Sequence, residues 1–360
     1  MKKLSLLILF IPLVSFGQNS DFSKYNNQIN NLKNEVKYFE IEKINNQFYM
    51  LIGGGGNVGV FISDNEVVLI DNKYEIIEDV LMTSLRKITD KPIKYIINTH
   101  FHHDHSDGNR AFGKQGIPII SHQNAKKRMM EDAELYGGIF SSIKDFIQPK
   151  YDKNSLPILT YDSKMTISQG NEEIELYNFG KAHTDGDSVV VFKNNNIIHT
   201  GDAFVRYGYP YVDLNNGGSI KGLIDLLRAL ELLCDDNTII MPGHGSLSKK
   251  EDVINLKNTL NDLYNKTIIG LKNGLSYNEI SDSIDETLNE NKIVKLNYIK
   301  SIELELSRKK NYEKTNWTIM KLKDFIYNKK TKESHLLGLL FIIAVTIVVG
   351  AVIYYLWTER

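Results

Sequence analysis

Residues 99–105 read THFHHDH and contain the spacing HxHxDH. They directly follow residues 95–97, an apolar run that is predicted to form a β-strand. Histidine makes up 9 of the 360 residues, so this combination arises by chance in well under about 1 in 1000 chains of such composition. Because loops at the C-terminal ends of strands carry the functional side chains of many α/β proteins, this stretch is a candidate site.

The spacing within the motif divides its side chains into two groups. His100 and His102 stand two residues apart on extended backbone, so they can point the same way and share one metal ion. Asp104 and His105 come after a turn and can face a second ion. A metal-free surface loop is the weaker interpretation, because clustered imidazole and carboxylate groups gain most from a cation that fixes them.

Three further candidates follow predicted strands later in the chain: His183 in KAHTDGDS, Asp202 in HTGDAF and His244 in MPGHG. Each of them alone would be an ordinary loop residue, but their joint occurrence in this order completes two metal sites. Such sites leave positions open for water, which is typical of a catalytic centre. We expect His100, His102 and His183 on one ion, Asp104, His105 and His244 on the other, and Asp202 bridging both.

The order of the apolar segments predicts an α/β fold. Residues 48–70 contain three short β-branched runs separated by turn residues, as in an antiparallel meander, and residues 74–88 show helical spacing. The second half repeats the strands, adds a helix at 220–233 and then becomes mainly helical. Two mixed β-sheets flanked by helices, an αββα sandwich, fit this order, and we expect one catalytic domain over residues 38–328.

Composition limits the chemistry of the chain. The chain has 43 lysine and arginine residues against 44 aspartate and glutamate residues, so no basic surface for nucleic-acid phosphates is expected. A nucleic-acid partner is therefore disfavoured. The hydrophobic fraction of 42% is enough for a substantial core. The single cysteine, Cys234, excludes disulfide frameworks and four-cysteine zinc modules within the chain, which leaves histidine and carboxylate groups to hold a metal.

Both ends of the chain carry apolar segments. Residues 1–18 have a basic start and an apolar run, as in a secretory signal peptide, and residues 19–37 form a polar leader. A Lys-rich linker at 329–335 precedes residues 336–357, which contain no charged residue over 22 positions. At about 1.5 Å per residue these span roughly 33 Å as a transmembrane helix. Lysines before this span favour a cytoplasmic domain, but large domains translocate largely regardless of loop charge. We expect an exported domain, anchored by this helix at the periplasmic face of the cell envelope.

The motifs HFHHDH, AHTDGD, HTGD and PGHG resemble those of the metallo-β-lactamase superfamily, and the likeness extends from about residue 38 to 328. The resemblance implies the αββα sandwich, two zinc ions per chain or another divalent metal in their place, and hydrolysis. It also implies that Asp71, which follows the predicted strand 67–70, orients a histidine ligand. The expected nucleophile is a hydroxide that bridges the two ions, and Asp104 would help to place it.

The expected substrate is a small molecule with a carbonyl group: a lactone, an ester or an amide. Asp202 stands where zinc β-lactamases usually carry Cys or Ser, so hydrolysis of β-lactams is the second choice. An iron-dependent persulfide dioxygenase is a further alternative, since its ligands are a subset of these. Arg206 and Asn216 are candidate substrate contacts, one for a carboxylate and one as part of a polar loop. The sequence specifies no oligomeric state.

Overall fold

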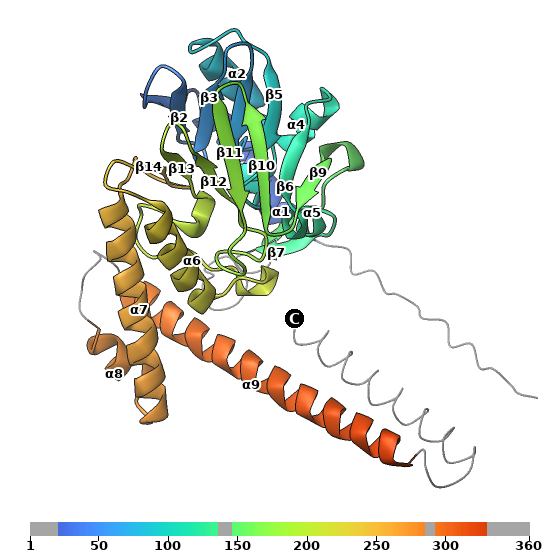
Figure 1. Cartoon of the computed structure of the whole chain (residues 1–360), viewed down its shortest axis with the longest axis vertical. Coiled ribbons are helices and arrows are strands. Elements are labelled where there is room, and N and C mark those ends of the chain that lie inside the picture. Colours follow the sequence, from blue (N-terminus) through green and yellow to red (C-terminus); the bar gives the residue numbers. More distant parts are fainter. Residues whose placement is uncertain (1–20, 136–145, 285–291, 330–360) are drawn as a thin grey trace, which may run out of the picture.

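The computed structural model describes residues 21–135, 146–284 and 292–329. In this part of the chain two β-sheets lie face to face (Figure 1), and helices pack on the outer face of each. The expected αββα sandwich is therefore confirmed.

The first sheet is antiparallel at one edge and parallel at the other. Successive strands from β1 to β4 pair antiparallel, whereas β4, β5, β6 and β9 run parallel. Strands β3 and β4 are buried along their whole length, which explains why their sequences are continuously apolar. Over the described residues the spatial order is β1 (Glu40–Lys43), β2 (Phe48–Ile52), β3 (Val58–Ile62), β4 (Val67–Ile70), β5 (Ile93–Ile97), β6 (Ile119–His122) and β9 (Leu159–Tyr161).

The second sheet repeats this plan on a smaller scale. Strands β10 to β13 pair antiparallel, and β14 joins β13 in parallel. A separate antiparallel pair of short strands, β7 (Ala133–Leu135) and β8 (Phe146–Gln148), lies outside both sheets. The spatial order of the second sheet in the described residues is β10 (Lys164–Gln169), β11 (Glu172–Tyr177), β12 (Val189–Phe192), β13 (Ile197–His199) and β14 (Ile239–Met241).

Aromatic side chains join the inner faces of the two sheets. Phe48 stacks on Phe61 within the first sheet, and Phe192 of the second sheet meets Phe48 edge-on, each pair with ring centroids 4.8 Å apart. Such pairs contribute about 0.5–1.5 kcal/mol beyond the burial of their surface. Aliphatic side chains of both sheets complete this buried cluster, which holds the sheets and their terminal loops in a fixed relation.

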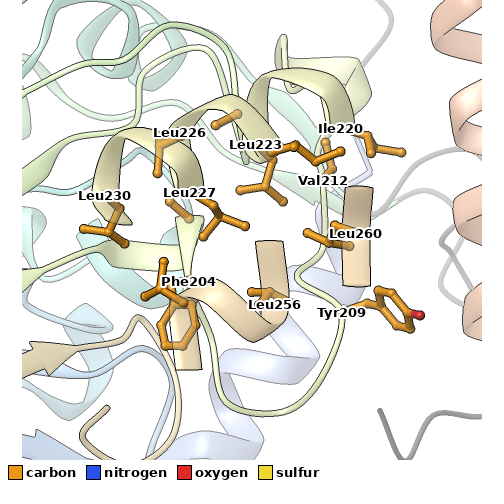
Figure 2. Close-up of a cluster of buried hydrophobic side chains, with 14 of the residues drawn as sticks. Phe204, Tyr209, Val212, Ile220, Leu223, Leu226, Leu227, Leu230, Leu256 and Leu260 are labelled. Atoms are coloured by element: carbon orange, nitrogen blue, oxygen red, sulfur yellow. The ribbon is translucent and has the colours of Figure 1, made fainter. Parts of the chain in front are cut away.

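Helices cover the outer faces of the sandwich. On the first sheet, α2 (Glu78–Arg86) and α4 (Asn109–Lys114) pack through Leu81, Leu85 and Phe112. On the second sheet, α6 (Ile220–Leu233) and α7 (Lys250–Lys272) form a leucine-rich buried cluster (Figure 2). The same cluster includes side chains of α8 (Tyr277–Asp282) and of the first turns of α9 (Lys292–Lys329).

Helix α1 (Ser23–Glu35) falls within the expected polar leader, yet it packs on the domain. Tyr25 is 6% exposed, and its hydroxyl donates a hydrogen bond to Asp107 at 2.9 Å. Packing against the sandwich therefore begins before residue 38. The remaining short elements are η1 (Glu75–Ile77), α3 (His103–Ser106), α5 (Gln123–Met129), η3 (Lys153–Ser155), η4 (Gly201–Ala203) and η5 (Leu214–Asn216).

Parallel pairing brings the candidate loops to one edge of the sandwich. Because parallel strands end on the same side, Asp71 after β4 lies beside the histidine motif after β5, and Asp202 after β13 lies beside His244 after β14. The two edges also meet directly: Asn57 N–H donates to Gly243 O at 2.7 Å. The strand order thus explains how ligands far apart in sequence share one place.

The remaining expectations concern the first predicted helix of the domain and the two ends of the chain. The helix expected over residues 74–88 is shorter than predicted, because the chain starts with the 3-10 turn η1 and becomes α-helical only at Glu78. Among the helices in the described residues, none is long and apolar enough to cross a membrane. The predicted signal peptide at 1–18 and the predicted span at 336–357 lie outside the described residues.

Candidate metal centre

The first cluster consists of three buried histidines. The ligand nitrogens of His100, His102 and His183 all lie within 4.8 Å of one another, and His183 Nε2 is 2.9 Å from His102 Nδ1. His100 follows β5, His102 precedes the first turn of α3, and His183 lies in the loop between β11 and β12. Each half of the sandwich therefore contributes to this cluster.

Hydrogen bonds fix which ring nitrogen of His100 faces the cluster. His100 Nδ1 lies 3.0 Å from Thr99 Oγ1, which in turn donates to Asp71 at 2.7 Å. His100 Nε2 is buried and has no hydrogen-bond partner among the described residues. A buried nitrogen lone pair without a donor is costly, whereas coordination to a cation would satisfy it. The cluster therefore fits a metal ion.

His102 is held by a residue that the sequence analysis did not identify. Its Nε2–H donates to Asp213 Oδ2 at 3.0 Å, which leaves Nδ1 to face His183. Asp213 also accepts a hydrogen bond from Asn216 Nδ2 at 2.8 Å, and the same amide group donates to Glu134 O at 3.0 Å. The amide group of Asn216 thus supports Asp213 inside the protein, and its contact with substrate stays a prediction.

The second cluster combines carboxylate and imidazole groups. The ligand atoms of Asp104, His105 and His244 lie within 4.8 Å of one another, and Asp104 Oδ2 is 3.1 Å from His244 Nε2. Asp71 accepts a hydrogen bond from His105 Nδ1 at 2.7 Å, so that His105 Nε2 faces the cluster. Asp71 thus occupies the orienting position that the family resemblance implied.

Asp202 lies between the two clusters. Its Oδ1 is 3.0 Å from His105 Nε2 and 3.4 Å from His244 Nε2, while its Oδ2 is 3.7 Å from His183 Nε2. Asp202 also forms a group of potential ligands with His100 and His105. This is the place that a bridging carboxylate requires.

Electrostatics distinguish the two clusters. Burial lowers the pKa of His183 to about 4 and that of His100 well below its usual value, so both are neutral and able to bind a metal. Burial also opposes a charge on His244 and His105, but the carboxylates around them outweigh this effect. They raise the pKa of His244 to about 9 and that of His105 well above its usual range. His105 and His244 thus retain protons beside the ionised carboxylates of Asp104 and Asp202, so this donor set favours positive charge at the place where a cation would bind.

Two glycines allow close packing around the ligands. A Cβ at Gly56 would lie 2.2 Å from His105 Cε1, and a Cβ at Gly243 would lie 2.0 Å from Asp202 Oδ1. Contacts this short do not occur, so both positions require glycine. Gly56 N–H also donates to Asp104 O at 3.1 Å, which ties the turn between β2 and β3 to the second cluster.

The side chain of Lys73 holds the glycine turn between β2 and β3 in place. Its side chain is fully buried, and Nζ donates to Gly53 O at 2.7 Å and to Gly56 O at 2.5 Å. Burial lowers the pKa of Lys73 to about 7, and the charges of Asp104 and Asp71 only partly oppose this shift. The amine group therefore stabilises the glycine turn that packs against His105.

Arg206, a predicted substrate contact, lies in the loop after Asp202 and forms an ion pair. Its guanidinium group pairs with Asp252 of α7, with Nη1 2.6 Å from Oδ1. Its backbone N–H donates to His244 O at 3.0 Å. Arg206 therefore links the loop after Asp202 to helix α7, and its contact with substrate stays a prediction.

The centre is most open above the second cluster. The side chain of His244 is 24% exposed and that of Asp104 is 13% exposed, whereas His105 is inaccessible. In the first cluster His183 is only 1% exposed. Solvent therefore reaches the centre mainly on the side of His244 and Asp104.

Comparison with known proteins agrees with this geometry. A family model described as the metallo-beta-lactamase superfamily matches residues 51–244, a range that contains all seven potential ligands. The chain belongs to the metallo-beta-lactamase superfamily. A probable metallo-hydrolase of Methanocaldococcus jannaschii is 25% identical to this superfamily member over 211 residues. The alignment covers 53% of this chain and 92% of that protein.

Solved structures share the superfamily fold. A metallo-beta-lactamase from Pontibacter korlensis aligns with a TM-score of 0.51 at 18% identity, covering 62% of this chain and 99% of that one. A double mutant of the sec-alkyl sulfatase PisA1 aligns with a TM-score of 0.56 at 12% identity, covering 76% of this chain and 51% of that one. At these identities the likeness shows the fold alone. Superfamily membership and the ligand clusters together identify a metal-dependent hydrolase.

Proposed function

We propose that this metal-dependent hydrolase cleaves a small lactone, ester or amide and uses two zinc ions per chain. The observation that carries the proposal is the convergence of seven side chains into adjoining clusters, each with ligand atoms within 4.8 Å of one another. Adjoining clusters that share Asp202 suit a pair of ions, which in two-metal hydrolases lie about 3.5–4 Å apart. Neutral imidazoles and carboxylates are ligands that zinc prefers.

The residues around the ions have distinct roles in this proposal. When bound, the ions supply Lewis acidity, lowering the pKa of water towards about 7 and polarising a carbonyl oxygen. Asp104 reaches the opening, so its carboxylate can accept a hydrogen bond from the attacking water and orient it. Asp71 and Asp213 hold the rings of His105 and His102, which keeps the ligands in place during turnover.

The charges near the opening support a substrate without a carboxylate group. Arg206, beside the loop of His244, is paired with Asp252. Arg128 pairs with Asp185 in the loop of the first cluster, with Nη2 2.7 Å from Oδ2. Both guanidinium groups are therefore already neutralised, and neither is free to bind the carboxylate that β-lactam drugs carry. This favours a neutral lactone, ester or amide over a β-lactam.

We also propose that the reaction takes place at the periplasmic face of the cell envelope. The charge-free stretch 336–357 and the signal-peptide pattern at 1–18 support this location. Protease treatment of intact and permeabilised cells tests it. An exported domain is digested once the outer barrier is opened, whereas protection until the inner membrane is lysed contradicts the proposal.

Metal content and activity of the full-length chain test the proposed chemistry. We expect about two zinc ions per chain by elemental analysis, and loss of hydrolysis after chelation with recovery on adding zinc. A substrate panel of a homoserine lactone, a chromogenic ester and nitrocefin identifies the carbonyl class. Hydrolysis of nitrocefin alone would shift the substrate class to β-lactams, and iron in place of zinc would favour the dioxygenase alternative. Full activity after complete chelation would refute the proposal.

A further inference from the structure

Residues 206–213, which we call the strap, connect the two clusters. At one end, Arg206 N–H donates to His244 O at 3.0 Å. At the other end, Asp213 N–H donates to His183 O at 2.8 Å, and Tyr211 O accepts a hydrogen bond from His183 Nδ1–H at 2.6 Å. The strap therefore extends from the second cluster to the first.

The strap is anchored by contacts with α9 and with the leucine-rich cluster. The ring of Tyr209 packs against Tyr298 of α9 with centroids 5.0 Å apart, and Tyr298 Oη–H donates to Pro210 O. Tyr209 and Val212 belong to the leucine-rich cluster under α6 and α7 (Figure 2). A turn at Gly208, with φ +117°, separates the buried ring of Tyr209 from the exposed ring of Tyr207.

Two tyrosine rings of the strap lie against the metal-binding histidines. Tyr207 is 54% exposed, and its ring lies 5.7 Å from that of His244 at an angle of 61°. The ring of Tyr211 lies 6.2 Å from that of His102 and 5.9 Å from that of His183. One ring thus borders each cluster, and Tyr207 stands on the side where the centre is open.

From this arrangement we propose that Tyr207 and Tyr211 form an aromatic subsite that binds a planar, apolar substituent of the substrate. The inference rests on the proposed hydrolysis of a carbonyl compound and adds the substituent that the centre selects. A carbonyl group held between the clusters places its attached groups along the strap, where they meet the faces of these rings. Stacking is favoured as the means of recognition because both neighbouring guanidinium groups, those of Arg206 and Arg128, are paired with carboxylates.

Esters that share one acid and differ in the alcohol test the subsite. The full-length chain should hydrolyse the benzyl ester with a kcat/KM about tenfold higher than the methyl ester, as stacking and burial of one ring contribute roughly 1.4 kcal/mol. Tyr207→Ala should remove most of this preference, mainly through a higher KM for the benzyl ester. Tyr207→Phe should keep the preference, because the ring and not the hydroxyl makes the contact. Tyr38→Ala is the matched control, since Tyr38 is 74% exposed and lies outside the strap.

A binding experiment separates the failure of this inference from the failure of the proposed function. Calorimetric titration of the zinc-loaded chain with benzylphosphonate and methylphosphonate measures the preference without any turnover. A benzyl preference that falls in Tyr207→Ala supports the subsite even if no ester is hydrolysed, an outcome that would reject only the proposed reaction. A benzyl-to-methyl ratio that Tyr207→Ala leaves unchanged, or that Tyr207→Phe reduces as much as Tyr207→Ala, would overturn the inference.

Discussion

Replacing Gly56 with alanine is expected to disable the second cluster. The added Cβ would lie 2.2 Å from His105 Cε1 and 2.4 Å from Nε2, whereas ordinary contacts begin at 3.4 Å. The ring must therefore move by 3.4 − 2.2 = 1.2 Å, or the turn must move away and lose its hydrogen bond to Asp104 O. A misplacement of about 1 Å in a catalytic group costs about 100-fold in rate. We expect kcat/KM to fall by about that factor and the zinc content to drop from two ions towards one.

The assay compares kcat/KM, zinc per chain and thermal unfolding for Gly56→Ala and for Gly53→Ala, a control in the same turn. A Cβ at Gly53 would meet no atom within 4 Å, although its φ of +102° disfavours a side chain. The control should therefore lose about 1 kcal/mol of stability while retaining zinc and activity. If Gly56→Ala keeps both ions and a kcat/KM within about twofold of the unsubstituted chain, the steric reasoning is wrong.

Other substitutions test the surroundings of the ions. Asp213→Ala removes the acceptor that orients His102 and should weaken zinc binding at the first cluster by about 10–100-fold in chelator competition; unchanged binding would contradict its positioning role. Asp252→Ala frees the Arg206 guanidinium and should raise kcat/KM for nitrocefin severalfold relative to a neutral ester, whereas an unchanged ratio would mean that this arginine does not reach substrate. Burial lowers the pKa of Lys73 from 10.5 to about 7, so the folded chain binds fewer protons than the unfolded chain between these values. The free energy of unfolding should therefore rise with pH in this window, by at most about 1.4 kcal/mol per pH unit. Lys73→Met should lack this contribution, which urea unfolding at two pH values measures; equal pH slopes would contradict the assigned pKa. Chelation should lower the melting temperature, since ions present at 100 times their Kd stabilise the fold by about 2.7 kcal/mol.

The sequence predicted the fold and the convergence of the ligands because both depend on local patterns. The apolar runs at 48–52, 58–62 and 67–70 coincide with observed strands. The second and third of these strands are buried along their whole length, which requires a continuously apolar sequence. The helix at 220–233 also has the predicted bounds. The seven potential ligands stand in short motifs at strand ends, so their recognition required no knowledge of long-range contacts.

Residues that act through contacts distant in sequence were not predictable in the same way. Asp213 lies 111 positions from His102 and belongs to no motif, so only the folded chain shows that it holds this ring. Lys73 has no sequence signal that marks it as buried, because lysines are mostly exposed in folded proteins, yet it lies under the glycine turn. The pairing of Arg206 with Asp252 of α7 was not predictable either, because nothing in the sequence indicates it.

The division of the ligands between the two sheets has a consequence for protein synthesis. The first sheet and its loops supply His100, His102, Asp104 and His105, while His183, Asp202 and His244 come from the second. A nascent chain on the ribosome cannot assemble either complete ligand set until strands from both halves have docked, and His244 emerges last of the seven. A metal ion can therefore find a complete ligand set only after the two halves have docked, and a chain truncated before His244 would lack one ligand of the second cluster.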